Sequence, residues 1–257
     1  MTTMIATDLD RTLVFSPRAI AELGGALPAQ VVETLDGRPV SELADEVAEG
    51  LASPRAEIVP VTTRTPEQLA RLQLPLHPAF VIAACGAVIL ADGMPDAGWA
   101  AVIGQRVAAA APLERATDLL RGHPGVLRAY RSDAFAYAVV AADFDGRALA
   151  VEAGQAGYVL TRSGRKAYLL PNGLDKAAAV SHVAARIGAD RVLAAGDSLL
   201  DRSMLELADR AWVPRGSELA ADPPPRACIT QGTGHAAAVE IVTGWRSATS
   251  ATAACAS

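Results

Sequence analysis

Two aspartates one residue apart, Asp8 and Asp10, follow a short apolar segment near the start of the chain, in the order T-M-I-A-T-D-L-D-R-T-L. Met4, Ile5 and Ala6 have few polar neighbours, which is typical of a strand buried on both faces of a parallel sheet. Open α/β sheets bind their ligands at the carboxyl ends of the strands. We therefore expect Asp8 at the end of the first strand, where a rigid backbone presents its carboxylate to a substrate.

A second pair of aspartates follows another strand-like segment. Residues 191–196 are apolar and lead into Asp197, with Asp201 four residues further on. If this segment lies beside the first strand in one parallel sheet, its aspartates converge with Asp8, and crowded carboxylates raise one another's pKa unless a cation compensates. Mg²⁺ prefers oxygen ligands and commonly combines carboxylates with water and substrate phosphate, and nothing nearby is soft enough to prefer zinc or copper. The pattern predicts a Mg²⁺ site.

Phosphate is the ligand that the remaining polar residues favour. Lys176 lies in the first turn of an expected helix, where a cation opposes the helix dipole by about 0.3–1 kcal/mol, so a nearby anion explains it better. Helix N-termini already favour phosphate. Thr62 ends the strand-like segment 57–62, Thr63 follows it, and both offer hydroxyls to the same oxygens. Arg64, next along the chain, is expected to fix its loop or helix rather than to touch a substrate.

Four short segments, D-L-D-R-T-L, V-T-T-R, L-D-K and G-D-S-L-L-D, occur in this order along the chain. Together they resemble the four motifs of the haloacid dehalogenase (HAD) superfamily. The segment between the second and third motifs is similar to the type IIB caps of that superfamily. The nearest relatives in character are sucrose-phosphate, trehalose-phosphate and mannosyl-3-phosphoglycerate phosphatases and phosphomannomutase. Two positions depart from the usual pattern: Thr63 stands where relatives usually have glycine, and Cys85 stands where many have asparagine.

The resemblance implies a role for each motif residue. Asp8 would be the nucleophile that takes the phosphoryl group as an aspartyl-phosphate. Asp10 would protonate the leaving oxygen and then activate water. Thr62, Thr63 and Lys176 would bind the phosphoryl oxygens. Mg²⁺ would be held by the Asp8 carboxylate, the Asp10 backbone carbonyl and Asp197, with Asp201 orienting these ligands. The implied metal site therefore comprises Asp8, Asp10, Asp197 and Asp201.

Each of these residues also has a simpler interpretation. Asp8 and Asp10 could be turn residues that cap the next helix, and Thr62 could be an ordinary hydroxyl at a strand end. Lys176 could be a solvated lysine. Asp201 could cap a helix, which is compatible with a role at a metal. The order and spacing of the four motifs favour the chemical interpretation.

The hydrophobic pattern predicts an α/β fold, with a Rossmann-like parallel sheet flanked by helices and an inserted α+β cap of αββαββ order. We assign the catalytic core to residues 1–92 and 172–245, the cap to 93–171, and a flexible tail to 246–257. The elements expected outside the motifs are helices at 41–51, 65–74, 99–120, 145–156, 173–187, 201–208 and 234–242, a strand or hairpin at 80–90, two strands within 126–141, a hairpin at 158–170, and a last short strand at 211–213.

The composition excludes several classes of protein. The chain has 257 residues, of which 51% are hydrophobic, so it can bury a core. Its net charge of −5 argues against a general nucleic-acid binder. No apolar run reaches the roughly 20 residues that span a bilayer, and no signal peptide is evident. Cys85, Cys228 and Cys255 are odd in number and widely spaced, which fits a reducing, cytoplasmic location without a zinc site.

The expected function is Mg²⁺-dependent hydrolysis of a small phosphomonoester, with a sugar phosphate as the leading substrate class by family analogy. A phosphomutase, which uses the same aspartyl-phosphate chemistry, is the nearest alternative. A phospho-acceptor signalling domain of the receiver type is a third, although such domains are about half this length and have no cap. Basic residues of the insert are candidate contacts for a polar substrate: Arg128, Arg131, Arg165 and Lys166. Oligomeric state is left open.

Overall fold

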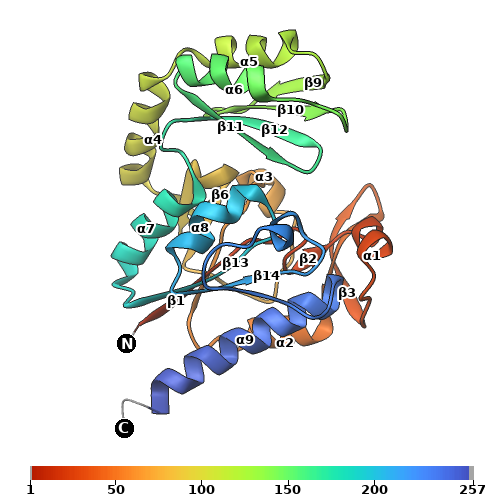
Figure 1. Cartoon of the computed structure of the whole chain (residues 1–257). Helices are drawn as coiled ribbons and strands as arrows, with labels where there is room; N and C mark the ends of the chain where they lie inside the picture. The colour runs from red at the N-terminus through yellow and green to blue at the C-terminus, as the bar shows by residue number, and fades with distance from the viewer. Residues whose placement is uncertain (1, 255–257) are drawn as a thin grey trace.

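The computed structural model describes residues 2–254, and a five-stranded parallel sheet lies at its centre (Figure 1). The strand order is β15-β14-β13-β1-β5. The strands are β1 (Thr3–Thr7), β5 (Glu57–Pro60), β13 (Arg191–Ala195), β14 (Arg210–Val213) and β15 (Ala227–Ile229). The first strand lies between the other two motif-bearing strands, and Thr7 pairs with both Ala195 and Pro60. Three motif segments therefore leave the sheet at the same level. Because β15 follows β14, the prediction that residues 211–213 form the last strand is wrong.

Alternating residues of β1 face two different helical layers. Met4 and Ala6 belong to a core cluster shared with α7 (Lys176–Ile187) and α8 (Arg202–Leu207). Ile5 belongs to the opposite cluster, which includes residues of α2 (Asp45–Ala52) and α9 (Gly234–Ala254). Figure 1 shows α2 and α9 together beneath the sheet. Burial on both faces explains the uninterrupted apolar composition of this strand.

A β-hairpin precedes α2, and the helix begins later than the sequence predicted. The chain after β1 forms β2 (Val14–Phe15), α1 (Pro17–Leu23), β3 (Ala29–Leu35) and β4 (Arg38–Ala44), with sheet order β2-β4-β3. A helix beginning at Ser41 was expected, but residues 41–44 are strand, because Leu43 pairs with Val14 and is fully buried there. The helix begins at Asp45, and Val47 and Leu51 form its buried face as predicted.

The segment after β5 contains one short helix and an antiparallel sheet. The expected helix 65–74 is only α3 (Pro66–Leu69), because the backbone N–H of Gln73 already donates to the Val32 carbonyl at 2.8 Å. The hairpin alternative for residues 80–90 is confirmed. Its elements are β6 (Phe80–Ala83), the 3-10 turn η1 (Ala84–Gly86), β7 (Val88–Ala91) and β8 (Met94–Pro95).

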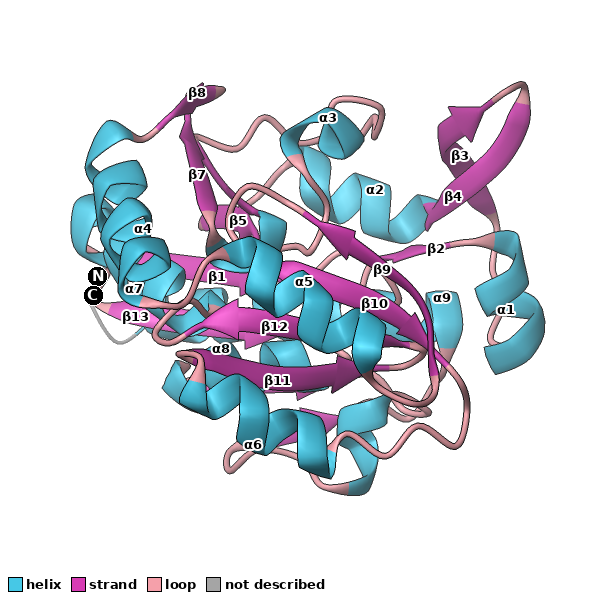
Figure 2. Ribbon diagram, turned by 90° about the horizontal axis from the view of Figure 1, so that it is seen from above, coloured by secondary structure: helices cyan, strands magenta, loops and turns pink. Residues whose placement is uncertain are grey.

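The inserted unit is a four-stranded antiparallel sheet of order β11-β12-β10-β9, with helices α5 and α6 over one face (Figure 2). Its elements are α4 (Ala97–Ala109), α5 (Leu113–Gly122), β9 (Val126–Arg131), β10 (Ala136–Val140), α6 (Arg147–Gln155), β11 (Tyr158–Ser163) and β12 (Lys166–Pro171). The expected αββαββ order runs from α5 to β12. The single helix predicted over 99–120 is two helices, because Pro112 has no N–H to continue α4 and Ala110 is already extended.

The C-terminal helix is longer than the sequence suggested. The predicted helix over 234–242 and flexible tail over 246–257 are corrected by α9, which continues to Ala254. Trp245 and Ala248 are buried against the core, and Arg55 donates a hydrogen bond of 2.9 Å to the Ser250 hydroxyl. Residues 255–257, including Cys255, lie outside the described residues. The remaining 3-10 turns are η2 (Leu199–Asp201) and η3 (Glu218–Ala221). Among residues 2–254, neither α9 nor any other helix is long and apolar enough to cross a bilayer.

Candidate active site

Three aspartates meet at the carboxyl end of the central strand. Asp8 directly follows β1, where its N–H donates to the Ala195 carbonyl of β13 at 2.9 Å. Asp197 follows β13, and Asp201 closes η2. Each residue offers a carboxylate oxygen, and these oxygens lie within 4.8 Å of one another. The predicted convergence of Asp8, Asp197 and Asp201 is therefore present in the fold.

Lys176 provides the cation of this cluster. Its side chain is 1% exposed, and its ammonium donates to Asp8 Oδ1 at 2.7 Å, Asp201 Oδ1 at 2.5 Å and the Val61 carbonyl at 3.0 Å. These three acceptors use all three N–H bonds of the ammonium. Asp175, the N-cap of α7, holds the helix start by accepting the N–H of Ala178 at 2.7 Å. Lys176 is thus a buried ion-pair partner and not a solvated lysine.

The cluster has more negative than positive charge. Burial raises the pKa of Asp8 to about 7; the Lys176 ammonium lowers it, and Asp201 and Asp10 add to the increase. Burial, together with Asp8 and Asp201, also raises the pKa of Asp197 well above its ordinary value. Burial alone would lower the pKa of Lys176, but the two carboxylates outweigh it and raise that pKa. Three ionised carboxylates and one ammonium leave a deficit of two positive charges. Oxygen donors with this deficit fit Mg²⁺.

Asp201 also shapes the loop that carries Asp197. Its Oδ2 accepts the Ser198 N–H and the Ser198 hydroxyl, both at 2.9 Å, and the Asp197 N–H at 3.2 Å. Gly196 is required for this approach, because a Cβ atom there would lie 2.5 Å from Asp201 Cβ. Both carboxylate oxygens of Asp201 are therefore engaged by the protein. This arrangement suits a residue that orients its neighbours.

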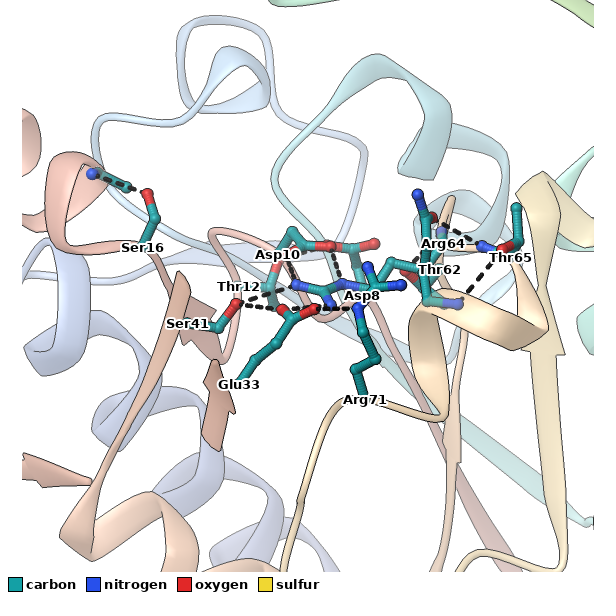
Figure 3. A network of polar contacts seen from close by, with 12 residues as sticks. Asp8, Asp10, Thr12, Ser16, Glu33, Ser41, Thr62, Arg64, Thr65 and Arg71 are labelled. Atoms are coloured by element: carbon teal, nitrogen blue, oxygen red, sulfur yellow. Dashed lines mark hydrogen bonds and ion pairs between the residues drawn. The ribbon is translucent and has the colours of Figure 1, made fainter. Parts of the chain in front are cut away.

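Asp10 lies beside the three-aspartate cluster and pairs with Arg64 instead (Figure 3). Arg64 Nε donates to Asp10 Oδ2 at 2.8 Å, and Nη2 donates to Oδ1 at 2.7 Å, which is a bidentate ion pair. The Arg64 side chain is 11% exposed, whereas that of Asp10 is 44% exposed. The Asp10 carboxylate is therefore accessible yet fixed in orientation. Sequence reasoning gave Arg64 a role in its own loop and missed this contact.

Three more residues of this network, Glu33, Ser41 and Arg71, lie outside the four motifs. Arg64 Nη1 donates to Glu33 Oε2 at 2.7 Å, Ser41 Oγ donates to the same oxygen at 2.8 Å, and Arg71 Nε reaches Glu33 Oε1 at 3.4 Å. Glu33 and Ser41 come from the β3–β4 hairpin (Figure 3). The motif spacing does not predict these three residues, because it does not indicate that this hairpin reaches the site.

The two threonines of the second motif occupy different positions. Thr62 has no exposed surface, and its hydroxyl oxygen accepts the Arg64 N–H at 3.1 Å. Thr63 lines the cavity beside Asp8. Thr62 lies level with Asp8 in the sheet, since the Val61 N–H before it donates to the Thr7 carbonyl at 2.7 Å.

A cavity of about 630 Å³ separates this edge of the sheet from the inserted unit. The core side contributes Asp8, Asp10 and Asp197, and the inserted unit contributes aromatic and basic residues. The latter are Phe135, Tyr137, Tyr168, Arg131 and Lys166. Tyr137 and Tyr168 are stacked with ring centroids 5.9 Å apart. Two of the four basic residues singled out in the insert, Arg131 and Lys166, thus line the cavity.

The class of protein follows from the matched family together with the fold. Solved structures of similar fold include phosphatases of the HAD superfamily, and the family match makes this chain a phosphoric monoester hydrolase of that superfamily. A narrower assignment comes from the sequence: the model of the family described as sucrose-6F-phosphate phosphohydrolase matches residues 1–213, so the chain belongs to that family. The resemblance to the superfamily stated from the motifs is confirmed. A sequence search of curated proteins gave no significant match.

Three solved structures illustrate the likeness. The sucrose-phosphatase of Synechocystis sp. PCC6803, solved with sucrose and phosphate, is 14% identical; the match covers 96% of this chain and 99% of that chain with a TM-score of 0.69. A Thermoplasma acidophilum protein is 15% identical, with coverages of 96% and 99% and a TM-score of 0.61. A HAD-superfamily phosphatase from Bacteroides thetaiotaomicron is 14% identical, with coverages of 96% and 96% and a TM-score of 0.59. At these identities the likeness concerns the fold.

Proposed function

We propose that this chain is a Mg²⁺-dependent phosphatase that hydrolyses a sugar phosphate through an aspartyl-phosphate on Asp8. The observation that carries the proposal is the buried cluster of Asp8, Asp197, Asp201 and Lys176, which lacks two positive charges when its three carboxylates are ionised and borders a large cavity. A sugar phosphate is the proposed substrate because of the family and because the Synechocystis structure was solved with sucrose and phosphate.

In the first step, a carboxylate oxygen of Asp8 attacks phosphorus while the bond between phosphorus and the leaving oxygen breaks. Lys176 holds Asp8 Oδ1 at 2.7 Å and so fixes the direction of the carboxylate. The Thr12 hydroxyl, 3.3 Å from Asp8 Oδ2, assists in this orientation. Asp8, Asp197 and the Asp10 carbonyl would hold Mg²⁺, and Asp201 would orient these ligands; a bound ion would supply positive charge that offsets the carboxylates and the phosphoryl oxygens.

Asp10 moves the protons in both steps. The first step uses the protonated form of Asp10, whose carboxyl group gives its proton to the departing sugar oxygen. The resulting carboxylate, the form that pairs with Arg64 Nε and Nη2, then takes a proton from the water that hydrolyses the aspartyl-phosphate. Thr62, Thr63 and Lys176 bind the phosphoryl oxygens, for which the Lys176 ammonium exchanges one of its three protein acceptors for a phosphoryl oxygen. Arg64 holds both oxygens of the Asp10 carboxylate, and the Asp10 side chain, 44% exposed, lines the cavity.

The inserted unit, residues 93–171, serves as the cap over a core formed by residues 1–92 and 172–245. Its aromatic residues, Phe135, Tyr137 and Tyr168, give the sugar an apolar surface, and Arg131 and Lys166 give its hydroxyls polar partners. Closing a cavity of about 630 Å³ over a small metabolite excludes bulk water from the aspartyl-phosphate.

The test is phosphate release from a panel of sugar phosphates and from p-nitrophenyl phosphate. We expect turnover that EDTA abolishes and Mg²⁺ restores, and that Asp8→Asn lowers by at least about a thousandfold. Unchanged turnover in Asp8→Asn would rule out the covalent mechanism. An isomeric sugar phosphate formed without free phosphate would identify a phosphomutase instead.

A further inference from the structure

Glu33 is a buried carboxylate outside the four motifs. Its side chain is 2% exposed, although it lies on a hairpin whose neighbouring residues Val31 and Leu35 are exposed. Buried carboxylates require partners, and Glu33 has Arg64, Ser41 and Arg71. Burial would raise the pKa of Glu33, but the hydrogen bonds from Arg64 and Ser41 outweigh it and lower that pKa. Glu33 is thus held as an anion.

The backbone of β3 is distorted in a way that turns Glu33 toward the site. Val31 pairs with Glu42 of β4, but Glu33 pairs with Ser41, so two steps along β3 match one step along β4. This irregularity buries both Val32 and Glu33, two consecutive residues that a regular strand would send to opposite faces. Bulges of this kind commonly redirect a side chain beside an active site.

The contacts form a continuous path from Glu33 to Asp10. The Arg64 guanidinium contacts both carboxylates: Nη1 donates to Glu33, whereas Nε and Nη2 donate to the two oxygens of Asp10. Because the guanidinium is planar, its contact with Glu33 fixes the plane in which Asp10 is held. Ser41 Oγ accepts a further N–H from Nη2 at 3.1 Å. Figure 3 shows the Arg64 guanidinium between the two carboxylates.

We propose that Glu33 is a positioning residue for proton transfer by Asp10, acting through Arg64. This proposal rests on the function proposed above, in which Asp10 protonates the leaving oxygen. Without the Glu33 carboxylate, the guanidinium can rotate toward other acceptors, and Asp10 loses its fixed orientation. Glu33 itself touches neither the phosphoryl group nor the metal ligands.

The leaving group provides a readout that a purely structural role would not change. p-Nitrophenolate departs with little help from an acid, whereas a sugar alkoxide requires protonation. We therefore compare kcat/KM of Glu33→Gln for p-nitrophenyl phosphate and for the fastest sugar phosphate of the panel. We expect kcat/KM for the sugar phosphate to fall at least about tenfold further than that for the aryl phosphate. An equal loss on both substrates, or no loss, overturns the proposal.

Matched variants isolate the effect. Glu42→Gln removes a carboxylate from the same hairpin but away from Arg64, and should leave the ratio of the two kcat/KM values unchanged. Glu33→Asp keeps the charge and should restore part of the sugar-phosphate activity. If Glu33→Gln fails to fold, Ser41→Ala removes one hydrogen bond to Glu33 and one to Arg64, and should shift the ratio in the same direction by a smaller factor.

The two proposals fail in distinguishable ways. If wild-type protein releases phosphate and Asp8→Asn does not, the proposed function stands whatever Glu33→Gln shows. A ratio that stays constant in Glu33→Gln and Ser41→Ala then overturns only the role of Glu33. Activity retained in Asp8→Asn overturns the proposed function.

Discussion

Replacing Lys176 by methionine removes the positive charge from the buried cluster with little change in side-chain length. The lysine is 1% exposed and holds Asp8 and Asp201 at 2.7 and 2.5 Å, so methionine leaves three crowded carboxylates without their ammonium. Breaking a buried ion pair by removing one partner destabilises a protein by about 3–5 kcal/mol. For a chain of this size, each kcal/mol lowers Tm by about 2–4 °C. We therefore expect a fall in Tm of roughly 6–20 °C at pH 8 without metal.

The assay is thermal unfolding followed by tryptophan fluorescence, since Trp212 and Trp245 are buried in the core. Loss of Lys176 leaves the carboxylates free to bind protons in the folded state, so the defect should shrink near pH 5.5, and millimolar Mg²⁺ should reduce it at pH 8. Lys166→Met, at an exposed lysine that lines the cavity of about 630 Å³, should change stability by no more than about 0.5 kcal/mol. If Lys176→Met unfolds within about 2 °C of wild type in metal-free buffer at pH 8, the ion pairs of Lys176 with Asp8 and Asp201 do not contribute the expected stability.

Three further outcomes follow from the same contacts. The pKa of Asp8 is raised from its ordinary value of 3.8 to about 7. Protonation of Asp8 therefore stabilises the metal-free fold in full below pH 3.8, and this stabilisation is lost as pH rises through 7. The gain in Tm on adding Mg²⁺ should be larger at pH 8 than near pH 5.5, and an equal gain at both pH values would contradict the raised pKa of Asp8. Gly196→Ala should displace Asp201 and cut Mg²⁺-dependent turnover by at least about tenfold, whereas Gly104→Ala, with open space at its Cβ, should leave turnover unchanged. Trp245→Ala, at 2% exposure, should lower stability by about 3–5 kcal/mol in urea unfolding, and a change under 1 kcal/mol would show that the end of α9 does not pack on the core.

The sequence was informative where one local pattern determines the structure. Met4 to Thr7 has a composition typical of a strand buried on both faces, and its pairing with β13 and β5 brings Asp8 and Asp197 to one edge. Asp175 and Gly188 mark the two ends of α7 by capping chemistry. The C-terminal end at Ile187 was predicted correctly, whereas the helix begins at Lys176, three residues after the predicted start at 173. The convergence of Asp8, Asp197 and Asp201 needed only the assumption that the strands are neighbours.

Other features depend on contacts between distant segments, which a local pattern does not contain. Residues 41–44 have helical spacing with Val47 and Leu51, but pairing of Leu43 with Val14 makes them strand. The burial of Glu33 results from a register irregularity against β4, and its partner Arg64 is 31 residues away. Trp245 and Ala248 of α9 pack against the core, although the small residues after them suggested a tail.

The site contains two adjacent charge clusters of opposite character. One lacks two positive charges and consists of Asp8, Asp197, Asp201 and Lys176. The other is balanced and consists of Asp10, Glu33, Arg64 and Arg71. A balanced cluster keeps its geometry without a ligand, whereas an unbalanced one at neutral pH must bind protons or a cation.

This difference assigns separate tasks to the two clusters. Mg²⁺ affinity should depend on the unbalanced cluster and remain the same in Glu33→Gln, because Glu33 contacts Arg64 and not the metal-binding carboxylates. The dependence of kcat/KM on the leaving group should instead respond to Glu33→Gln, because Arg64 connects Glu33 to Asp10. A Mg²⁺ titration and a leaving-group comparison on the same variant therefore measure the two clusters independently. A Glu33→Gln protein that lost Mg²⁺ affinity and leaving-group dependence together would show that the clusters act as one.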